Sequence, residues 1–129
     1  MLNINKIHHA AIICSDYEAS KHFYTHIMGF TILAENYREE RQSHKLDLAV
    51  NGDYAIELFS FPGPPQRVSR PEAAGLRHMA FEVDDIETSI AWLENNSVLC
   101  EPIRVDEFTN KRFTFFADPD GLPLEFYEK

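Results

Sequence analysis

Residues 4–13 (INKIHHAAII) and residues 76–83 (LRHMAFEV) decide the fold, because they begin two similar stretches of the chain. Both segments are apolar and contain β-branched or aromatic residues, which is typical of strands. Each is followed by an aspartate in the position of a helix N-cap, Asp16 and Asp85, and these two residues are 69 positions apart (85 − 16). The chain therefore contains an internal repeat, in which each unit begins with a strand and a capped helix.

Two histidines and two glutamates follow the same repeat. His9 and His78 are also 69 residues apart (78 − 9), and each stands seven residues before its cap. Glu57 and Glu125 are 68 residues apart (125 − 57), and each lies between two apolar residues. The shared register indicates that the four side chains occupy equivalent places in the two halves.

The remaining pattern predicts the order β-α-β-β-β in both halves. Residues 62–75 contain four of the seven prolines and are predicted to form a linker. We expect an α+β fold in which residues 1–129 form a single domain, built from modules 1–61 and 76–129. The expected elements are strands 4–13, 30–39, 45–50, 54–61, 76–83, 98–105, 112–117 and 122–127, and helices 17–27 and 86–96.

Strand alternation gives the four repeated residues a common environment. If the apolar neighbours of Glu57 and Glu125 pack against a helix, both carboxylates face the opposite, concave side, together with His9 and His78. A carboxylate on an apolar strand is costly to bury unless it is paired or binds a metal. The set predicts a site for a divalent ion such as Ni²⁺, Co²⁺, Mn²⁺, Fe²⁺ or Zn²⁺. The alternative is that the histidines belong to the core and the glutamates to exposed edges. His8 is predicted to point away from His9.

The charge balance excludes some partners. Twelve basic and 21 acidic side chains give a net charge of −9, which disfavours nucleic acid because that partner needs a basic stripe. No apolar run reaches the roughly 18 residues that cross a bilayer, and no basic-then-apolar leader follows Met1. The sequence thus predicts a cytoplasmic protein without a membrane partner.

These residues resemble the vicinal oxygen chelate superfamily, and within it the glyoxalase I group. The resemblance covers the chain from IHHAAIICSDYEASKHFYTHIMGF to the terminal DPDGLPLEFYE. It implies paired βαβββ modules that form a metal-binding cup, as in glyoxalases and dihydroxybiphenyl dioxygenases, commonly in a homodimer. It further implies that His9, Glu57, His78 and Glu125 are the metal ligands.

The resemblance also implies a chemistry. In that group the metal stabilises an enediolate of a small 2-oxo or 2-hydroxy carbonyl compound or its thiol adduct, and a ligand glutamate moves the proton. Glu125 is the better candidate for this base and Glu57 the other. At two positions where the group binds glutathione this chain has Ile13 and Phe61, which disfavours glutathione as the thiol. A non-catalytic, ligand-sequestering protein and a metal-dependent dioxygenase remain the alternatives to a lyase.

Four basic residues are predicted to bind a small-molecule substrate. Lys111 and Arg112 lead a strand next to the DPDG turn, and Arg67 and Arg70 lie in the proline-rich linker. Their positive charge suits an anionic group of the substrate.

Overall fold

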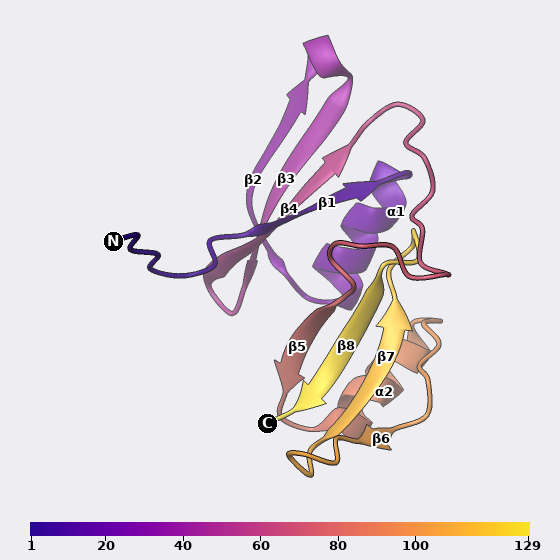
Figure 1. The fold of residues 1–129 in the computed structure, drawn as a ribbon. Helices are drawn as coiled ribbons and strands as arrows, with labels where there is room; N and C mark the ends of the chain where they lie inside the picture. The colour runs from indigo at the N-terminus through magenta and orange to yellow at the C-terminus, as the bar shows by residue number, and fades with distance from the viewer. The chain divides into compact units, whose positions relative to one another are not determined.

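The computed structural model describes residues 1–129, and the chain divides into two compact units (Figure 1). We call Met1–Pro65 the first module and Gln66–Lys129 the second module. The boundary between them lies inside the predicted linker, residues 62–75. Both modules have a helix after their first strand and a mixed four-stranded sheet, which confirms the predicted α+β fold with two βαβββ modules.

The first module forms one sheet with the strand order β1-β4-β3-β2. β1 runs parallel to β4, and the other neighbours are antiparallel. Its elements are β1 (Ala10–Cys14), α1 (Tyr17–His22), the π-helical turn η1 (Phe23–Ile27), β2 (Thr31–Arg38), the 3₁₀ turn η2 (Glu39–Arg41), β3 (Ser43–Val50) and β4 (Asp53–Ser60).

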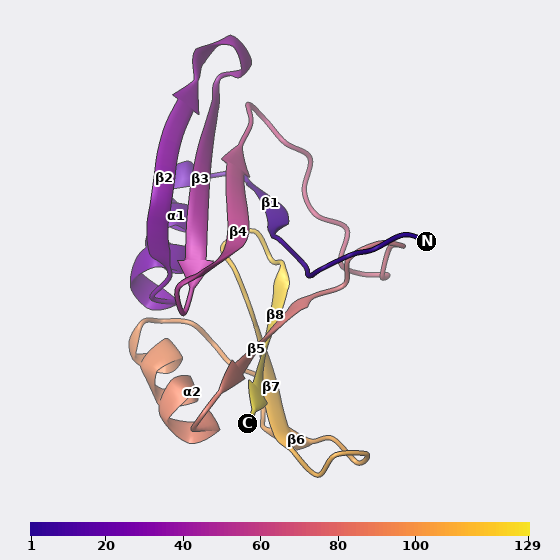
Figure 2. The same cartoon turned by 90° about the vertical axis from the view of Figure 1, so that its left-hand side faces the viewer.

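The second module repeats this plan with the strand order β5-β8-β7-β6. β5 is parallel to β8, and the remaining pairs are antiparallel. Figure 2 shows α2 on one side of this sheet. Its elements are β5 (Met79–Val83), α2 (Ile86–Asn95), β6 (Arg104–Val105), β7 (Arg112–Ala117) and β8 (Pro123–Glu128).

Four elements differ from the sequence prediction by three residues or more, and one of them is β5, which begins at Met79 rather than at residue 76. β1 begins at Ala10 rather than at residue 4, because its pairing with β4 covers only Ala10–Cys14. The predicted helix 17–27 changes to a π-helical turn at Phe23, where the Met28 N–H donates to the Phe23 carbonyl at 2.8 Å. Of the predicted strand 98–105, Arg104–Val105 forms a ladder with β7, and the Glu101 N–H donates to the Phe115 carbonyl at 2.8 Å. Pro102 lies between these contacts and has no N–H to donate.

Equivalent caps and core residues fix both modules. Asp16 and Asp85 adopt extended backbone conformations, and each carboxylate accepts a hydrogen bond from the N–H three residues later at 3.1 Å. Ile56, Leu58 and Leu124 are completely buried. Burying such side chains contributes roughly 1.5–3 kcal/mol each. These buried side chains form the helix-facing layer of each sheet, and the side chains that alternate with them point to the opposite face.

The DPDG sequence is a structural turn that leads into β8. The Asp118 carboxylate accepts hydrogen bonds from the N–H groups of Asp120 and Leu122, both at 2.9 Å. Gly121 has a φ of +80°, a left-handed conformation that favours glycine. The turn fixes where β8 begins and hence which face Glu125 occupies. None of the helices combines the length and the apolar character needed to cross a membrane.

Candidate functional site

In the first module, the parallel pairing of β1 with β4 brings a histidine to a glutamate. Ala11 lies opposite Glu57, and the neighbours of Glu57 on β4 are buried on the α1 side. Because successive side chains alternate faces, Glu57 points away from α1. His9 directly precedes β1, and its Nε2 lies 3.9 Å from Glu57 Oε1.

The second module repeats this arrangement in the same register. Ala80 lies opposite Glu125, and His78 directly precedes β5. His78 Nε2 lies 2.9 Å from Glu125 Oε2. The structure thus pairs each predicted histidine with the predicted glutamate of its own module.

The donor set of the two pairs fits a divalent ion. Two atoms that bind one ion at about 2.1 Å each, in tetrahedral or octahedral geometry, lie roughly 3.0–3.4 Å apart. The His–Glu distances of 3.9 Å and 2.9 Å bracket that range. Neither module alone gathers three or more His, Cys, Asp or Glu side chains into a metal-binding group.

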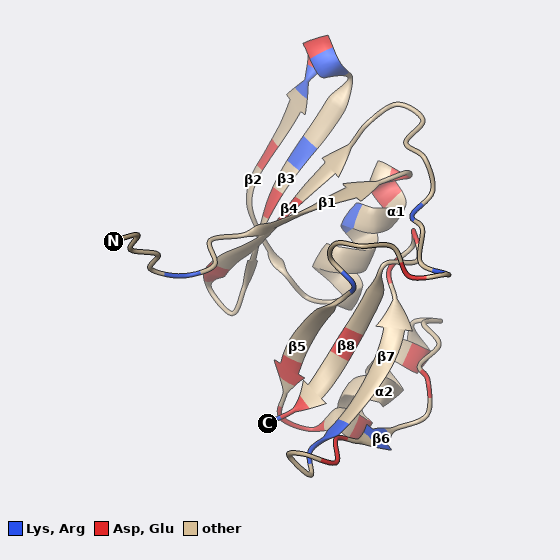
Figure 3. Ribbon diagram, viewed as in Figure 1, with Lys and Arg blue, Asp and Glu red and all other residues tan.

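Glu57 is surrounded by polar side chains of β3 and β4. The Tyr54 hydroxyl donates to Asp47 Oδ1 at 2.7 Å and to Glu57 Oε2 at 3.2 Å. Lys45 Nζ lies 2.9 Å from Asp47 Oδ1 and 3.5 Å from Glu57 Oε2. In Figure 3, β3 shows one basic and one acidic band next to β4. We call Lys45, Asp47 and Tyr54 the polar cluster.

The polar cluster has well-defined protonation states. Burial acts to raise the pKa of Asp47, but hydrogen bonds from Lys45 and Tyr54 outweigh it and hold that pKa below its ordinary value. Burial and the hydrogen bond to Asp47 raise the pKa of Tyr54. The hydrogen bond to Asp47 also raises the pKa of Lys45. Near neutral pH the phenol therefore keeps its one proton, which is donated mainly to Asp47 at 2.7 Å and is shared with Glu57 at 3.2 Å.

Glu125 has aromatic surroundings instead. Its neighbour on β7 is Phe115, whose ring contacts His78 edge-on at a centroid distance of 5.0 Å. Glu125 is only 8% exposed, and His78 is its one side-chain partner within hydrogen-bond distance. This carboxylate is thus held by packing and a single imidazole.

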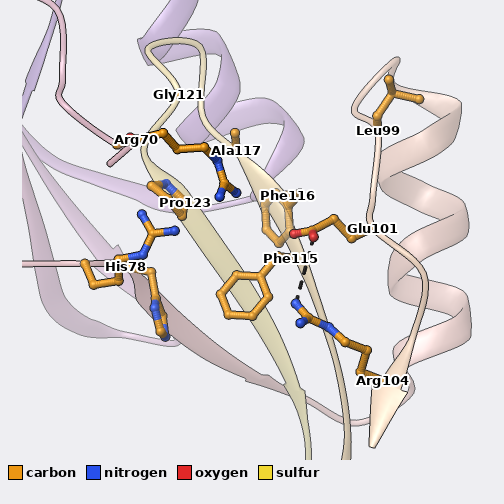
Figure 4. A pocket seen from close by; sticks show the side chains of 12 residues that line it. Arg70, His78, Leu99, Glu101, Arg104, Phe115, Phe116, Ala117, Gly121 and Pro123 are labelled. Atoms are coloured by element: carbon orange, nitrogen blue, oxygen red, sulfur yellow. Dashed lines mark ion pairs between the residues drawn. The ribbon is translucent and has the colours of Figure 1, made fainter. Parts of the chain in front are cut away.

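A cavity of about 590 Å³ lies in the second module next to His78 (Figure 4). Phe115 and Phe116 of β7 form part of its wall. In Figure 4, Arg70 and Arg104 reach toward this aromatic stretch from opposite ends. The volume falls within the roughly 300–1,000 Å³ of small-molecule sites.

Two of the predicted substrate-binding residues lie at the ends of β7 and β8. Arg112 donates to Glu128 and to Glu87 of α2, both at 3.1 Å, and these bonds raise the pKa of Arg112. Lys111 Nζ donates to the Lys129 carbonyl at 2.8 Å. Neither residue lines the cavity, and their role toward a substrate stays a prediction.

The other two lie in the predicted linker. Arg67 Nη2 donates to the carbonyls of Leu76 and Arg77, both at 2.9 Å, and thereby holds the segment that enters β5. Arg70 lines the cavity. The substrate role predicted for Arg67 and Arg70 likewise stays a prediction, and of the four basic residues only Arg70 borders the cavity.

Sequence reasoning missed the polar cluster and Arg77. Lys45 and Asp47 alternate with two leucines in the run KLDLAV, a signal that both charges share one face of a strand. The prediction for His8 is wrong: its Nδ1 lies 2.8 Å from Nδ1 of His9. Both histidines precede β1, so the strand alternation does not apply to them.

Comparisons with known proteins agree with this fold and identify a family. The family model described as Glyoxalase/Bleomycin resistance protein/Dioxygenase superfamily matches residues 6–126. The uncharacterized protein YaeR of Escherichia coli K12 is 64% identical over 129 residues, which is the whole of both chains. The crystal structure of a glyoxalase family protein from Enterococcus faecalis, at 50% identity, covers 95% of this chain and 97% of its own, with a TM-score of 0.89.

A more distant relative has a named activity. The lactoylglutathione lyase of Schizosaccharomyces pombe is 26% identical over 140 residues, which span 93% of this chain and 46% of the relative.

Proposed function

This chain belongs to the Glyoxalase/Bleomycin resistance protein/Dioxygenase superfamily, and from that membership we propose that it is a metal-dependent lyase or isomerase of the glyoxalase I type. Its substrate is a small 2-oxo or 2-hydroxy carbonyl compound or the thiol adduct of one. The similarity to a lactoylglutathione lyase supports this reaction class.

The observation that carries the proposal is the duplicated His–Glu pair. His9 with Glu57, and His78 with Glu125, lie at equivalent register positions in two modules with different surroundings. These four side chains would hold the divalent ion (Ni, Co, Mn, Fe or Zn). When bound, the ion would make the C–H beside a substrate carbonyl more acidic and stabilise charge on the oxygen.

Within this proposal the two glutamates have different tasks. Tyr54 and Lys45 contact Glu57 and fix the orientation of its carboxylate. Glu57 would therefore bind the metal ion without moving a proton. Glu125 has His78 as its one side-chain partner, so its carboxylate can turn toward a substrate carbon. We assign the proton transfer to Glu125 Oε2, with Glu57 as the alternative base.

The proposal includes a second copy of the chain. The sequence resemblance implies a homodimer with sites shared between the chains. Light scattering of the metal-loaded protein should then give twice the 14.9 kDa mass of one chain. A monomeric mass with full metal occupancy would remove the homodimer from the proposal.

Turnover tests the proposal directly. Metal-free protein is reloaded with Ni²⁺, Co²⁺, Mn²⁺ or Zn²⁺ and offered hemithioacetals of methylglyoxal with several thiols. At least one combination should be converted, and Glu125→Gln should slow it by roughly 10²–10⁴-fold, the usual contribution of a general base.

Glu94→Gln is the matched control, because Glu94 lies exposed on α2, and it should keep the wild-type rate. Activity that survives Glu125→Gln would contradict the base assignment. Failure of every thiol and metal would favour the ligand-sequestering alternative.

A further inference from the structure

We propose that the cavity beside His78 is an anion site, in which Arg70, Arg77 and Arg104 bind a carboxylate or phosphate group of the substrate. All three arginines line the cavity, against a single lining carboxylate, Glu101. This excess of positive charge is unusual for a chain with a net charge of −9. The placement at the metal centre rests on the proposed function, whereas the anion binding itself does not.

The three guanidinium groups are not strongly paired. Arg70 Nη1 lies 4.0 Å and Arg77 Nη2 3.8 Å from the same Glu72 oxygen, Oε1. Arg104 Nη2 lies 3.9 Å from Glu101 Oε1. These separations exceed the roughly 2.7–3.2 Å of N–H···O hydrogen bonds, so the N–H groups keep their capacity to donate.

The hydrogen-bonding capacity of Arg77 is not fully used in the structure. Its Nη1 atom is buried and has no hydrogen-bond partner. Buried donors in native structures are almost always satisfied, and an exception calls for a functional explanation. The guanidinium group would have to turn for this atom to donate to a carboxylate or phosphate oxygen in the cavity, because the atom has almost no accessible surface in the structure.

Aromatic rings hold one arginine in place and connect the site to His78. The Arg104 guanidinium lies 5.2 Å from the ring centroid of Phe113 and 5.3 Å from that of Phe115. Contacts of this kind fix a guanidinium plane before a ligand arrives. Phe115 also contacts His78 edge-on. An anion on these arginines would therefore place the rest of a small molecule against the imidazole of a candidate metal ligand.

Calorimetric titration of metal-free protein tests the anion site without requiring turnover. The probes are inorganic phosphate, pyruvate as a carboxylate, and hydroxyacetone as a neutral compound of similar size. Phosphate or pyruvate should bind, and hydroxyacetone should not. The tighter of the two anions identifies the group that the cavity prefers.

Arginine variants connect the binding to the cavity. Arg77→Gln and Arg104→Gln should each weaken anion binding roughly 10-fold or more, as expected for the loss of a charge-assisted hydrogen bond. Arg77→Lys should recover part of the affinity, since it keeps the charge but not the fork. Arg41→Gln, an exposed arginine of the first module, is the control and should bind like the wild type. Thermal melting confirms that the variants fold.

Two results would overturn the anion site: no binding of either anion at millimolar concentration, or equal affinity in the cavity variants and Arg41→Gln. The outcome is separable from that of the proposed function. Arginine-dependent anion binding without turnover of any thiol adduct keeps the anion site and removes the lyase. Turnover that is insensitive to Arg77→Gln and Arg104→Gln keeps the lyase and shows that the cavity arginines do not bind its substrate.

Discussion

The two modules share one backbone plan and differ in the side chains next to their glutamates. On β3 the residue opposite Glu57 is Asp47, and on β7 the residue opposite Glu125 is Phe115. The helix-facing neighbours, in contrast, are apolar and buried in both modules. The helix-facing layer therefore maintains the fold in both modules. On the opposite face, the side chains next to the His–Glu pair differ between the modules.

The same comparison shows two physical ways of orienting a carboxylate. In the first module Tyr54 and Lys45 contact Glu57 directly, within a network that also includes Asp47. In the second module burial and the His78 contact take the place of that network. A hydrogen-bond network fixes an orientation, whereas packing leaves the carboxylate able to exchange one partner for another.

The largest expected effect concerns the layer that the modules share. Ile56 and Leu124 directly precede the two glutamates and are completely buried. Ile56→Ala and Leu124→Ala should each lower the free energy of unfolding by about 2–5 kcal/mol, because both leave a cavity. Chemical denaturation measures the loss. Phe108→Ala, at a side chain that is 90% exposed, should stay within about 0.5 kcal/mol of the wild type. If only one of the two variants lost a large part of the free energy of unfolding, the helix-facing layers of the two modules would not be equivalent.

The next effect tests the face on which the modules differ. Phe115→Asp would give the second module the carboxylate that the first has, but without a lysine or tyrosine beside it. Two carboxylates would then face each other on neighbouring strands, and we expect a loss of roughly 2–4 kcal/mol from lost packing and repulsion. Phe115→Leu keeps an apolar side chain and should cost less than half as much. If Phe115→Asp and Phe115→Leu lowered the free energy of unfolding equally in chemical denaturation, the loss would come from packing alone and not from repulsion between carboxylates.

A smaller effect is expected from the polar cluster. Tyr54→Phe removes the donor to Asp47 and Glu57 and should lower the free energy of unfolding by about 1.5 kcal/mol, as expected for a hydrogen bond to a charged acceptor. Urea denaturation of metal-free protein measures this. Tyr37→Phe, at an exposed tyrosine of β2, is the control. A Tyr54→Phe variant as stable as this control would show that the network does not hold Glu57.

The smallest effect concerns an equivalent bond near the strand ends. The His44 N–H donates to Ser60 Oγ in the first module, and the Arg112 N–H donates to Glu128 Oε2 in the second, both at 2.9 Å. Hydrogen bonds from Arg112 hold the pKa of Glu128 below its ordinary value of 4.5. The stabilisation from Glu128 is therefore complete above pH 4.5 and is lost as the pH falls through the lower, folded-state pKa.

Melting temperatures from pH 7 to pH 3 check this sign. Glu128→Gln should melt slightly below the wild type at pH 7, and the difference should shrink as the pH falls below 4.5. Ser60→Ala removes an uncharged acceptor, so its difference from the wild type should not depend on pH. A Glu128→Gln difference that is constant with pH would contradict the ionic origin of the contact.

The sequence predicts that the two histidines and two glutamates occupy equivalent places in the two modules, because two regularities act together. Strand alternation assigns Glu57 and Glu125 to the face away from the helices, and the repeat distance places a histidine at the matching strand in each half. Both regularities are local or periodic, so one sequence is enough to read them. The predicted caps Asp16 and Asp85 are confirmed for the same reason.

The polar cluster cannot be placed so easily, because a β-bulge intervenes. A two-residue turn at Asn51-Gly52 pairs Val50 with Asp53, and unbroken pairing from there would put residue 56 opposite Asp47. The register shift between Leu48 and Ala49 brings Glu57 there instead. A shift of one residue in the pairing moves every side chain of the strand to the other face. No residue pattern in the sequence predicts the bulge between Leu48 and Ala49.

The parallel pairing of β1 with β4, and of β5 with β8, has a consequence for how the chain acquires its ligands. Ala10 and Ile56 are 46 residues apart (56 − 10), and Met79 and Leu124 are 45 apart (124 − 79). These are the least local strand contacts of each module, and contacts of high sequence separation form late in folding. A half-synthesised module therefore has its histidine but not yet the glutamate beside it. Under the proposed function, a metal ion would therefore bind only after the last strand of each module has docked, and it would not template the folding of the nascent chain.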